Sequence, residues 1–406
     1  MKPPRRSPAV AGGEPAERVL HLHLGHHKTG SSFLQSCFAA SAKALQRHGI
    51  LYPGADRQQH AAEGGISTGN GGPLVAFSRD GAERTAFPDL GRRFSVLFSN
   101  EALMRSYLTP GALHRLAVAA REAGAARIRM LLFIHDPVSH CASMYQQAVK
   151  RGGMTMGVDA FAERYVVPVQ VENFIKACAV EPDIDLTIRN YSVLRRDLRR
   201  SVTDWLGVPD DTLQAPAIAT VNRSLTRAEM QMQIVLNGLF GRCGELLSDP
   251  LCEGLPEMRA DEVRPSLAAQ ERLWARLETV IGRINDRLNP AHRYRRDVDA
   301  EEPPAPASLG LTPDQLRIAA ASLGAEIARL RMRLSGELDL LDRLIATQGN
   351  TSATRRFVLD LARSRDQAGD RTGAIDALRR LLAIAPDCVP ALRALRSYDE
   401  APATGA

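Results

Sequence analysis

The sequence predicts an α/β fold, a doubly wound parallel sheet, followed by an all-α region toward the carboxyl end. Three observations support this prediction. Short apolar runs that are typical of strands alternate with stretches of helical spacing, which favours parallel strands joined by helices. A glycine-bracketed turn joins the first strand to a helix, and beyond residue 310 only helical patterns remain. The predicted strands are Val19–Leu24, Phe94–Ser99, Arg127–Ile134 and Asp185–Tyr191.

The first strand and the turn after it predict an anion-binding site. Val19–Leu24 alternates leucines on one face with two histidines on the other. Gly25 ends the strand, and a helix begins at Ser31. Loop amides and the positive end of the helix dipole converge here, and Lys28 adds a positive charge, so a phosphate group can bind. The alternative is an ordinary polar turn with one lysine.

The spacing of this turn departs from the signature of nucleoside triphosphatases. Gly25 and Gly30 have the GxxxxG spacing, but serines follow Gly30 where that signature requires a lysine, and the lysine lies inside the loop. The arrangement resembles the 5′-phosphosulfate loop, HxGxxKTGTTxLQ, of sulfotransferases that use 3′-phosphoadenylyl sulfate (PAPS). The matching residues are His23, Gly25, Lys28, Thr29, Gly30, Ser31, Ser32, Leu34 and Gln35. The resemblance implies a P-loop-type sheet, PAPS as co-substrate, and cofactor binding by Lys28, Thr29, Gly30, Ser31 and Ser32.

Glu101 is the candidate catalytic base. It follows the second predicted strand, and in open α/β sheets ligands bind beyond the carboxyl ends of strands. Several sulfotransferases place a glutamate base after the strand that follows their phosphosulfate loop, so the resemblance implies the same role. In the alternative interpretation Ser99 caps a helix and Glu101 is an acid of its first turn.

The segment after the third strand resembles the 3′-phosphate motif of the same family, RxPxxRxxSxY. Asp136 is expected to cap a helix that begins at Pro137. Ser143 falls on the phosphate-binding serine, but His135 and His140 stand where the motif has arginines. Histidine is only partly charged at neutral pH, whereas arginine is always charged. The resemblance therefore implies that His135 and Ser143 contact the cofactor through a weaker or pH-dependent clamp.

Three further features have two interpretations each. The helix after Pro137 has a polar stripe that could bind an anion or face solvent: Ser139, Ser143, Gln146 and Lys150. Residues 222–226 resemble a segment of bacterial sulfotransferases that we expect to fold over the nucleotide, or they cap the next helix. Residues 54–92 form a long irregular segment in which part of the acceptor site is expected. His60 in that segment is a second base or a solvated side chain.

Composition divides the chain into four parts. Residues 1–17 are expected to be a disordered leader, residues 18–290 the sulfotransferase-like domain, and the proline-rich residues 291–310 a linker. Residues 311–400 form a helical region that begins with a capping box at Thr312 and continues as a helical hairpin or short coiled coil. Gly369–Leu392 resembles one tetratricopeptide unit, which must pack on the preceding helices or on another copy of the chain.

Composition also excludes several classes of protein. The net charge of +6 suits an anionic partner, but no basic run with interleaved aromatic residues indicates nucleic acid. The six cysteines form no CxxC pair, which predicts neither a zinc site nor a disulfide framework, and no cluster of metal ligands is found. No apolar stretch has the length of a signal peptide or transmembrane helix, so a cytoplasmic protein is expected.

These features predict an enzyme that transfers a sulfuryl group from PAPS to a hydroxyl or amine, on a glycan or glycolipid. In this interpretation Lys28 stabilises the leaving 5′-phosphate and Glu101 takes the proton of the acceptor. The first alternative is a non-catalytic nucleotide-binding module whose helical tail scaffolds a protein partner. The second alternative, a kinase, is disfavoured because no lysine follows Gly30.

Overall fold

The computed structural model describes residues 17–54, 69–79, 87–91, 93–215, 223–261, 263–301 and 310–400. These residues contain a five-stranded sheet in the order β2-β3-β1-β4-β5, in which all neighbours are parallel. The strands are β1 Val19–Leu24, β2 Ile50–Leu51, β3 Ser95–Asn100, β4 Arg127–Ile134 and β5 Ile184–Asn190. The predicted α/β class is confirmed, and each predicted strand lies within one residue of its observed bounds. Strand β2 was not predicted, because two residues are too few to show a period.

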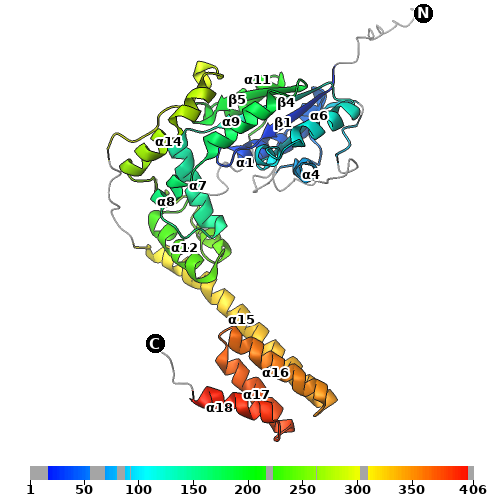
Figure 1. The fold of residues 1–406 in the computed structure, drawn as a ribbon, viewed down its shortest axis with the longest axis vertical. Helices are drawn as coiled ribbons and strands as arrows, with labels where there is room; N and C mark the ends of the chain where they lie inside the picture. Colours follow the sequence, from blue (N-terminus) through cyan, green and yellow to red (C-terminus); the bar gives the residue numbers. More distant parts are fainter. Residues whose placement is uncertain are drawn as a thin grey trace, which may run out of the picture. The chain divides into compact units, whose positions relative to one another are not determined.

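The order of the strands places three loops at one edge of the sheet (Figure 1). The chain runs from the central strand β1 to the edge strand β2, returns to β3, and then crosses to β4 on the other side of β1. Leu24 of β1 is aligned with Asn100 of β3 and with Leu132 of β4. The loops that follow β1, β3 and β4 therefore border a topological switch point, where ligands of open α/β sheets bind.

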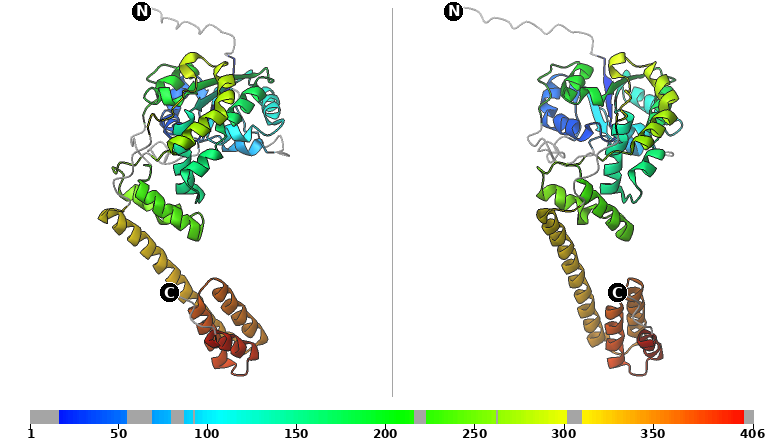
Figure 2. Two further views of the ribbon diagram at one scale, coloured as in Figure 1. Left: turned by 60° about the vertical axis from the view of Figure 1, so that its left-hand side comes forward. Right: turned by 90° about the vertical axis from the view of Figure 1, so that its left-hand side faces the viewer.

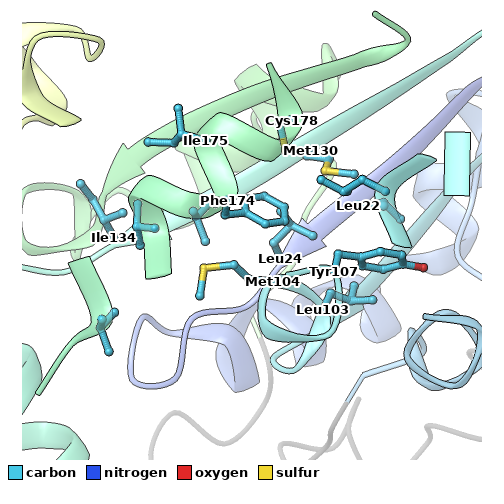
Figure 3. Close-up of a cluster of buried hydrophobic side chains, with 14 of the residues drawn as sticks. Leu22, Leu24, Leu103, Met104, Tyr107, Met130, Ile134, Phe174, Ile175 and Cys178 are labelled. Atoms are coloured by element: carbon cyan, nitrogen blue, oxygen red, sulfur yellow. The ribbon is translucent and has the colours of Figure 1, made fainter. Parts of the chain in front are cut away.

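One face of β1 packs into the larger hydrophobic core. The leucines of β1 are fully buried there among residues of several helices. Figure 3 shows part of this cluster, in which Leu24 lies among Phe174, Met104 and Leu103. The helices that contribute include α5 Leu103–Ser106, α6 Ala112–Glu122, α7 Pro137–Gly152, α9 Val167–Cys178 and α14 Leu267–Asn285.

The opposite face of the sheet is also covered, so that helices lie on both sides (Figure 2). Its helices are α1 Ser31–Ala40, α2 Ala42–Arg47 and α11 Leu198–Leu206. His21 and His23 point into this face and are buried, and the ring of His21 lies 5.4 Å from that of Trp205. Burial lowers the pKa of His21 to about 3 and that of His23 to about 4. The two polar residues that alternate with the leucines of β1 are therefore neutral histidines in the core.

Residues 291–301, predicted as part of a linker, pack on the sheet domain. Tyr294 is buried in the larger core, and Asn285 makes hydrogen bonds with its backbone. The carboxylate of Asp297 accepts hydrogen bonds from the backbone N–H groups of Val138 (3.0 Å) and Ser139 (2.7 Å). These contacts correct the predicted domain boundary at 290, because the residues beyond it complete the core and cap α7. Residues 302–309 lie outside the described residues.

The chain divides into two units, Met1–Gln315 and Leu316–Ala406. Helix α15, Pro313–Gln348, begins with the predicted capping box, in which Thr312 and Gln315 exchange hydrogen bonds of 2.7 and 3.3 Å. It is one continuous helix, and no hairpin interrupts it. Its Leu341 packs with α16 Ser352–Gln367, α17 Arg371–Ile384 and α18 Val389–Glu400 in a separate small core.

The remaining helices lie in the first unit and are short, except for α12. They are α4 Gly72–Phe77, α8 Val158–Glu163, α10 Tyr191–Leu194, α12 Arg227–Phe240, η3 Gly244–Leu246, α13 Ser248–Gly254 and η4 Pro290–His292.

Candidate functional site

The turn between β1 and α1 has an unusual backbone. Lys28 has φ 64°, and it is the one residue other than glycine with a positive φ in the described part of the chain. Gly30, two residues later, has φ 80° and precedes the first residue of α1. Strained backbone of this kind persists where the surrounding structure holds it, and it is concentrated at functional sites.

The same turn presents a row of unpaired hydrogen-bond donors. No described residue accepts a hydrogen bond from the backbone N–H groups between His26 and Phe33. The first helical bond runs from the N–H of Leu34 to the carbonyl of Gly30, at 3.0 Å. No side chain caps the N-terminus of α1, and its first turn contains no acidic residue. The turn can therefore direct several N–H groups and a helix dipole at an anion.

The hydroxyl groups of Thr29 and Ser31 make hydrogen bonds inside the turn. Thr29 Oγ1 donates to the carbonyl of His26 at 2.7 Å, and Ser31 Oγ donates to the same carbonyl at 3.3 Å. A hydroxyl that donates its proton inside the loop has none left for a phosphate oxygen. The side chains of Thr29 and Ser31 therefore stabilise the loop from inside. The backbone N–H groups of both residues stay unpaired. Ser32 is exposed.

Glu101 lies directly beside the turn. Gly25 allows this close approach, because a Cβ on it would lie 2.6 Å from the Cα of Glu101. The Gly25 N–H donates to the carbonyl of Asn100 at 3.1 Å. His27 Nδ1 and Glu101 Oε2 are 2.8 Å apart, and both side chains are partly exposed. A carboxylate held beside the anion cradle and open to solvent can accept a proton from a bound acceptor.

The alternative role predicted for Glu101, an acid in the first turn of a helix, does not fit its surroundings. Helix α5 begins at Leu103, two residues after Glu101. Ser99, the expected helix cap, is the penultimate residue of β3, and its Oγ lies 2.8 Å from Nδ1 of the buried His23. Glu101 therefore lies in the loop between β3 and α5.

Lys28 is half-buried, and two opposing effects act on its pKa. Burial is the main cause that lowers the pKa of Lys28, and the positive charge of Lys150 lowers it further. The carboxylate of Glu101 acts in the opposite direction. Two lysines and one carboxylate thus act on the same small region, and a bound polyanion would relieve the repulsion between the lysines.

Of the two histidines at the arginine positions of the second motif, His140 is buried and His135 is half-buried, and both are neutral. His140 Nε2 donates to the carbonyl of His27 and its Nδ1 accepts from the hydroxyl of Tyr165, both at 2.7 Å. Burial lowers the pKa of His140 to about 3 and that of His135 to about 4. The backbone of Lys28 partly offsets the lowered pKa of His135, and the His135 ring packs edge-on against Tyr191. Both histidines support the shape of the loop, and neither replaces the permanent charge of an arginine.

Ser143 and the start of α7 form the rest of the predicted 3′-phosphate site. Ser143 is half-buried on α7. The first N–H groups of that helix are already bound to Asp297, so they offer nothing to a ligand. Arg264 Nη1 donates to Ser139 Oγ at 3.2 Å, and the charge of Arg264 acts on His135. Arg264 is a permanent charge near His135 that sequence reasoning missed, and its Nε forms an ion pair with Asp299 at 3.0 Å. Nothing in the sequence links Arg264 to a helix more than a hundred residues away.

The segment expected to fold over the nucleotide is fixed by internal contacts. Arg223 forms a buried bidentate ion pair with Glu229, with both N–O distances at 2.7 Å. Thr226 and Glu229 form a capping box at the start of α12. The capping interpretation therefore accounts for residues 223–226. Asn222 and His60 lie outside the described residues.

No family model matches this chain, and no curated protein matches it. In the described part of the chain, no group of three or more His, Cys, Asp or Glu side chains is arranged to hold a metal ion. None of the described helices combines the length and apolarity needed to cross a membrane.

Proposed function

We propose that this chain is a sulfotransferase that moves a sulfuryl group from PAPS to a hydroxyl or amine of an acceptor. One observation supports the proposal most: Lys28 is held in a left-handed backbone inside a loop of unpaired N–H groups, at the carboxyl end of the central strand. Sulfuryl transfer is preferred to phosphoryl transfer because the lysine lies within the loop and serines follow Gly30.

In the proposed reaction, the bond between sulfur and the bridging phosphate oxygen breaks while the acceptor oxygen or nitrogen bonds to sulfur. Charge accumulates on the departing phosphate oxygen, and Lys28 neutralises it while the loop N–H groups hold the 5′-phosphate. Glu101 takes the proton of the acceptor. The contact of 2.8 Å between His27 and Glu101 orients this carboxylate toward the loop.

The role of Glu101 is tested by Glu101→Gln, which removes the base and preserves the shape of the side chain. We expect sulfate transfer from labelled PAPS to fall about 100- to 10,000-fold, which is the usual value of acid–base catalysis. Calorimetric affinity for adenosine 3′,5′-bisphosphate should stay at the wild-type value. The exposed Glu257 provides the matched control, Glu257→Gln. Full turnover in Glu101→Gln would remove this residue from the mechanism.

The acceptor and the binding partners belong to the same proposal. A glycan or glycolipid with acidic groups suits the net charge of +6. The tetratricopeptide-like unit packs on α15 and α16 in the small C-terminal core, as one of its two predicted arrangements requires. The C-terminal helices are proposed to bind a protein partner or a second copy of the chain, because Phe357 and Val389 stay exposed on them. A cytoplasmic location remains our prediction.

The second candidate function is a nucleotide-binding module without catalytic activity. It is favoured by one observation, the neutral histidines His135 and His140 where the family motif has arginines. In the catalytic proposal, Arg264 supplies the permanent charge for the 3′-phosphate instead. Binding of adenosine 3′,5′-bisphosphate without sulfate transfer to any acceptor of a native cell extract would favour the module. Magnesium-dependent ATP binding would instead favour a kinase.

A further inference from the structure

A buried lysine and a buried cysteine are in contact outside the proposed catalytic machinery. Lys150 lies near the end of α7, and Cys252 lies in α13. Their exposed fractions are 5% and 7%. The Nζ atom of Lys150 donates to the Sγ atom of Cys252 at 3.1 Å. Lys150 is the last residue of the polar stripe on α7. The proposed reaction assigns no catalytic role to this lysine.

Packing holds both side chains in place. A Cβ on Gly244 would lie 2.2 Å from the carbonyl oxygen of Lys150, so η3 packs tightly on the backbone of this residue. Cys252 Sγ donates to the carbonyl of Arg223 at 3.4 Å and belongs to a small core that includes Val149 of α7. Arg223 is itself fixed to the carbonyl of Leu251 at 3.0 Å. The nitrogen and the sulfur are therefore kept within contact distance by their surroundings.

We propose that peroxide converts this pair into a covalent N–O–S bridge between Lys150 and Cys252. One peroxide molecule oxidises the Cys252 thiol to a sulfenic acid and leaves as water. A second oxidises the Lys150 amine, once it has released its extra proton to solvent, to a hydroxylamine and also leaves as water. The hydroxylamine oxygen then attacks the sulfenic sulfur, and the sulfenic hydroxyl takes up the hydroxylamine O–H proton and departs as a third water. The bridge gains one oxygen and loses two hydrogens relative to the free pair.

The other cysteines provide internal comparisons. All six are buried and free. In the described part of the chain, no lysine donates a hydrogen bond to any of the remaining five. Burial raises the pKa of Cys141 and of Cys178 to about 12, which suppresses the reactive thiolate in both. Of the six cysteines, we therefore expect the bridge at Cys252 alone.

The bridge would alter the proposed nucleotide site through charge, and this consequence rests on the proposed function. The charge of Lys150 acts on Lys28, as the pKa of Lys28 shows. A nitrogen bonded to oxygen is a weak base, so the bridge removes one positive charge from the region that is proposed to bind a polyanion. Formation of the bridge itself does not depend on that function.

Peptide mapping of the full-length chain tests the bridge without any nucleotide. The protein is treated with increasing hydrogen peroxide, digested with trypsin and analysed by mass spectrometry, with and without dithiothreitol. We expect a peptide pair joined through Lys150 and Cys252, heavier by one oxygen and lighter by two hydrogens than its separate parts. Trypsin should not cleave after the bridged Lys150, and dithiothreitol should restore cleavage.

Two variants and one control make the assignment specific. Lys150→Arg and Cys252→Ser should each abolish the joined peptide, whereas Cys243→Ser should leave it intact. The wild-type map needs no variant, so a variant that fails to fold leaves the test decisive. The proposal is overturned if peroxide leaves both residues unmodified, if it takes Cys252 to a sulfinic acid while trypsin still cleaves at Lys150, or if Cys252 pairs with another cysteine.

Discussion

At the scale of single residues, the candidate site depends on a few backbone positions. Lys28 adopts a left-handed conformation that lysine rarely adopts, and Gly25 has no room for a side chain beside Glu101. The hydroxyls of Thr29 and Ser31 are directed to one carbonyl inside the loop. These features hold the loop in one shape, so its N–H groups are organised before a ligand arrives.

Gly25→Ala should disturb the loop and the base together. The new Cβ would meet the backbone of Glu101 at 2.6 Å, and backbone cannot move aside as a flexible side chain can. We expect a loss of about 1–3 kcal/mol in the free energy of unfolding, the usual cost of overpacking, measured by urea denaturation.

Gly238→Ala should change the free energy of unfolding in the opposite direction from Gly25→Ala. Gly238 lies inside helix α12, and a Cβ there would meet no atom within 4 Å. Alanine in a helix interior is more stable than glycine by about 0.5–1 kcal/mol, so this variant should be more stable than the wild type. Equal effects of the two substitutions would contradict the close approach of Gly25 and Glu101.

At the scale of elements, strand β1 and helix α7 bring unusual residues into the core. His21 and His23 of β1 and His140 of α7 are all buried with lowered pKa values. Each histidine is neutral in the folded protein, while in the unfolded chain it binds a proton near its ordinary pKa of 6.5. These elements therefore tie the stability of the fold to pH.

The contribution of these histidines to the free energy of unfolding is expected to be fully present above pH 6.5 and to be lost as the pH drops toward 4. In this window the unfolded state binds more protons than the folded state, so each buried histidine lowers the free energy of unfolding by about 1.4 kcal/mol per pH unit. His23→Gln should make the dependence shallower by about that amount between pH 6 and pH 4.5, in urea denaturation at several pH values. An unchanged slope would show that His23 is protonated in the folded protein.

At the scale of the whole molecule, two units with separate cores share one chain, and α15 begins in the first of them. Gln315 in its first turn donates to the buried Glu229 at 2.9 Å, and Glu229 is paired with Arg223. The start of the long helix is thus anchored in the segment that follows residue 222. The candidate site lies within the first unit, and all its residues come from the loops after β1, β3 and β4, from α7, and from Arg264.

The sequence predicted the sheet well because its strands carry strong local patterns. It also placed Lys28 and Glu101 in neighbouring loops, since parallel strands end at the same edge. It did not predict that His21 and His23 are buried, because the helix that covers them contains Trp205 and lies far along the chain. Arg264 was missed for the same reason, since tertiary contacts place it. The hydroxyls of Thr29 and Ser31 donate to the nearby carbonyl of His26, and the sequence motif alone does not show that local contact.

The most direct test of the account is calorimetric titration of Lys28→Ala with adenosine 3′,5′-bisphosphate, beside the wild type and Lys43→Ala, whose lysine is exposed on α2. A hydrogen bond to a charged group contributes about 1.5–3 kcal/mol, which corresponds to a loss of affinity of roughly 10- to 100-fold. The account predicts this loss in Lys28→Ala and wild-type affinity in Lys43→Ala. Wild-type affinity in Lys28→Ala would contradict the proposed role of the loop.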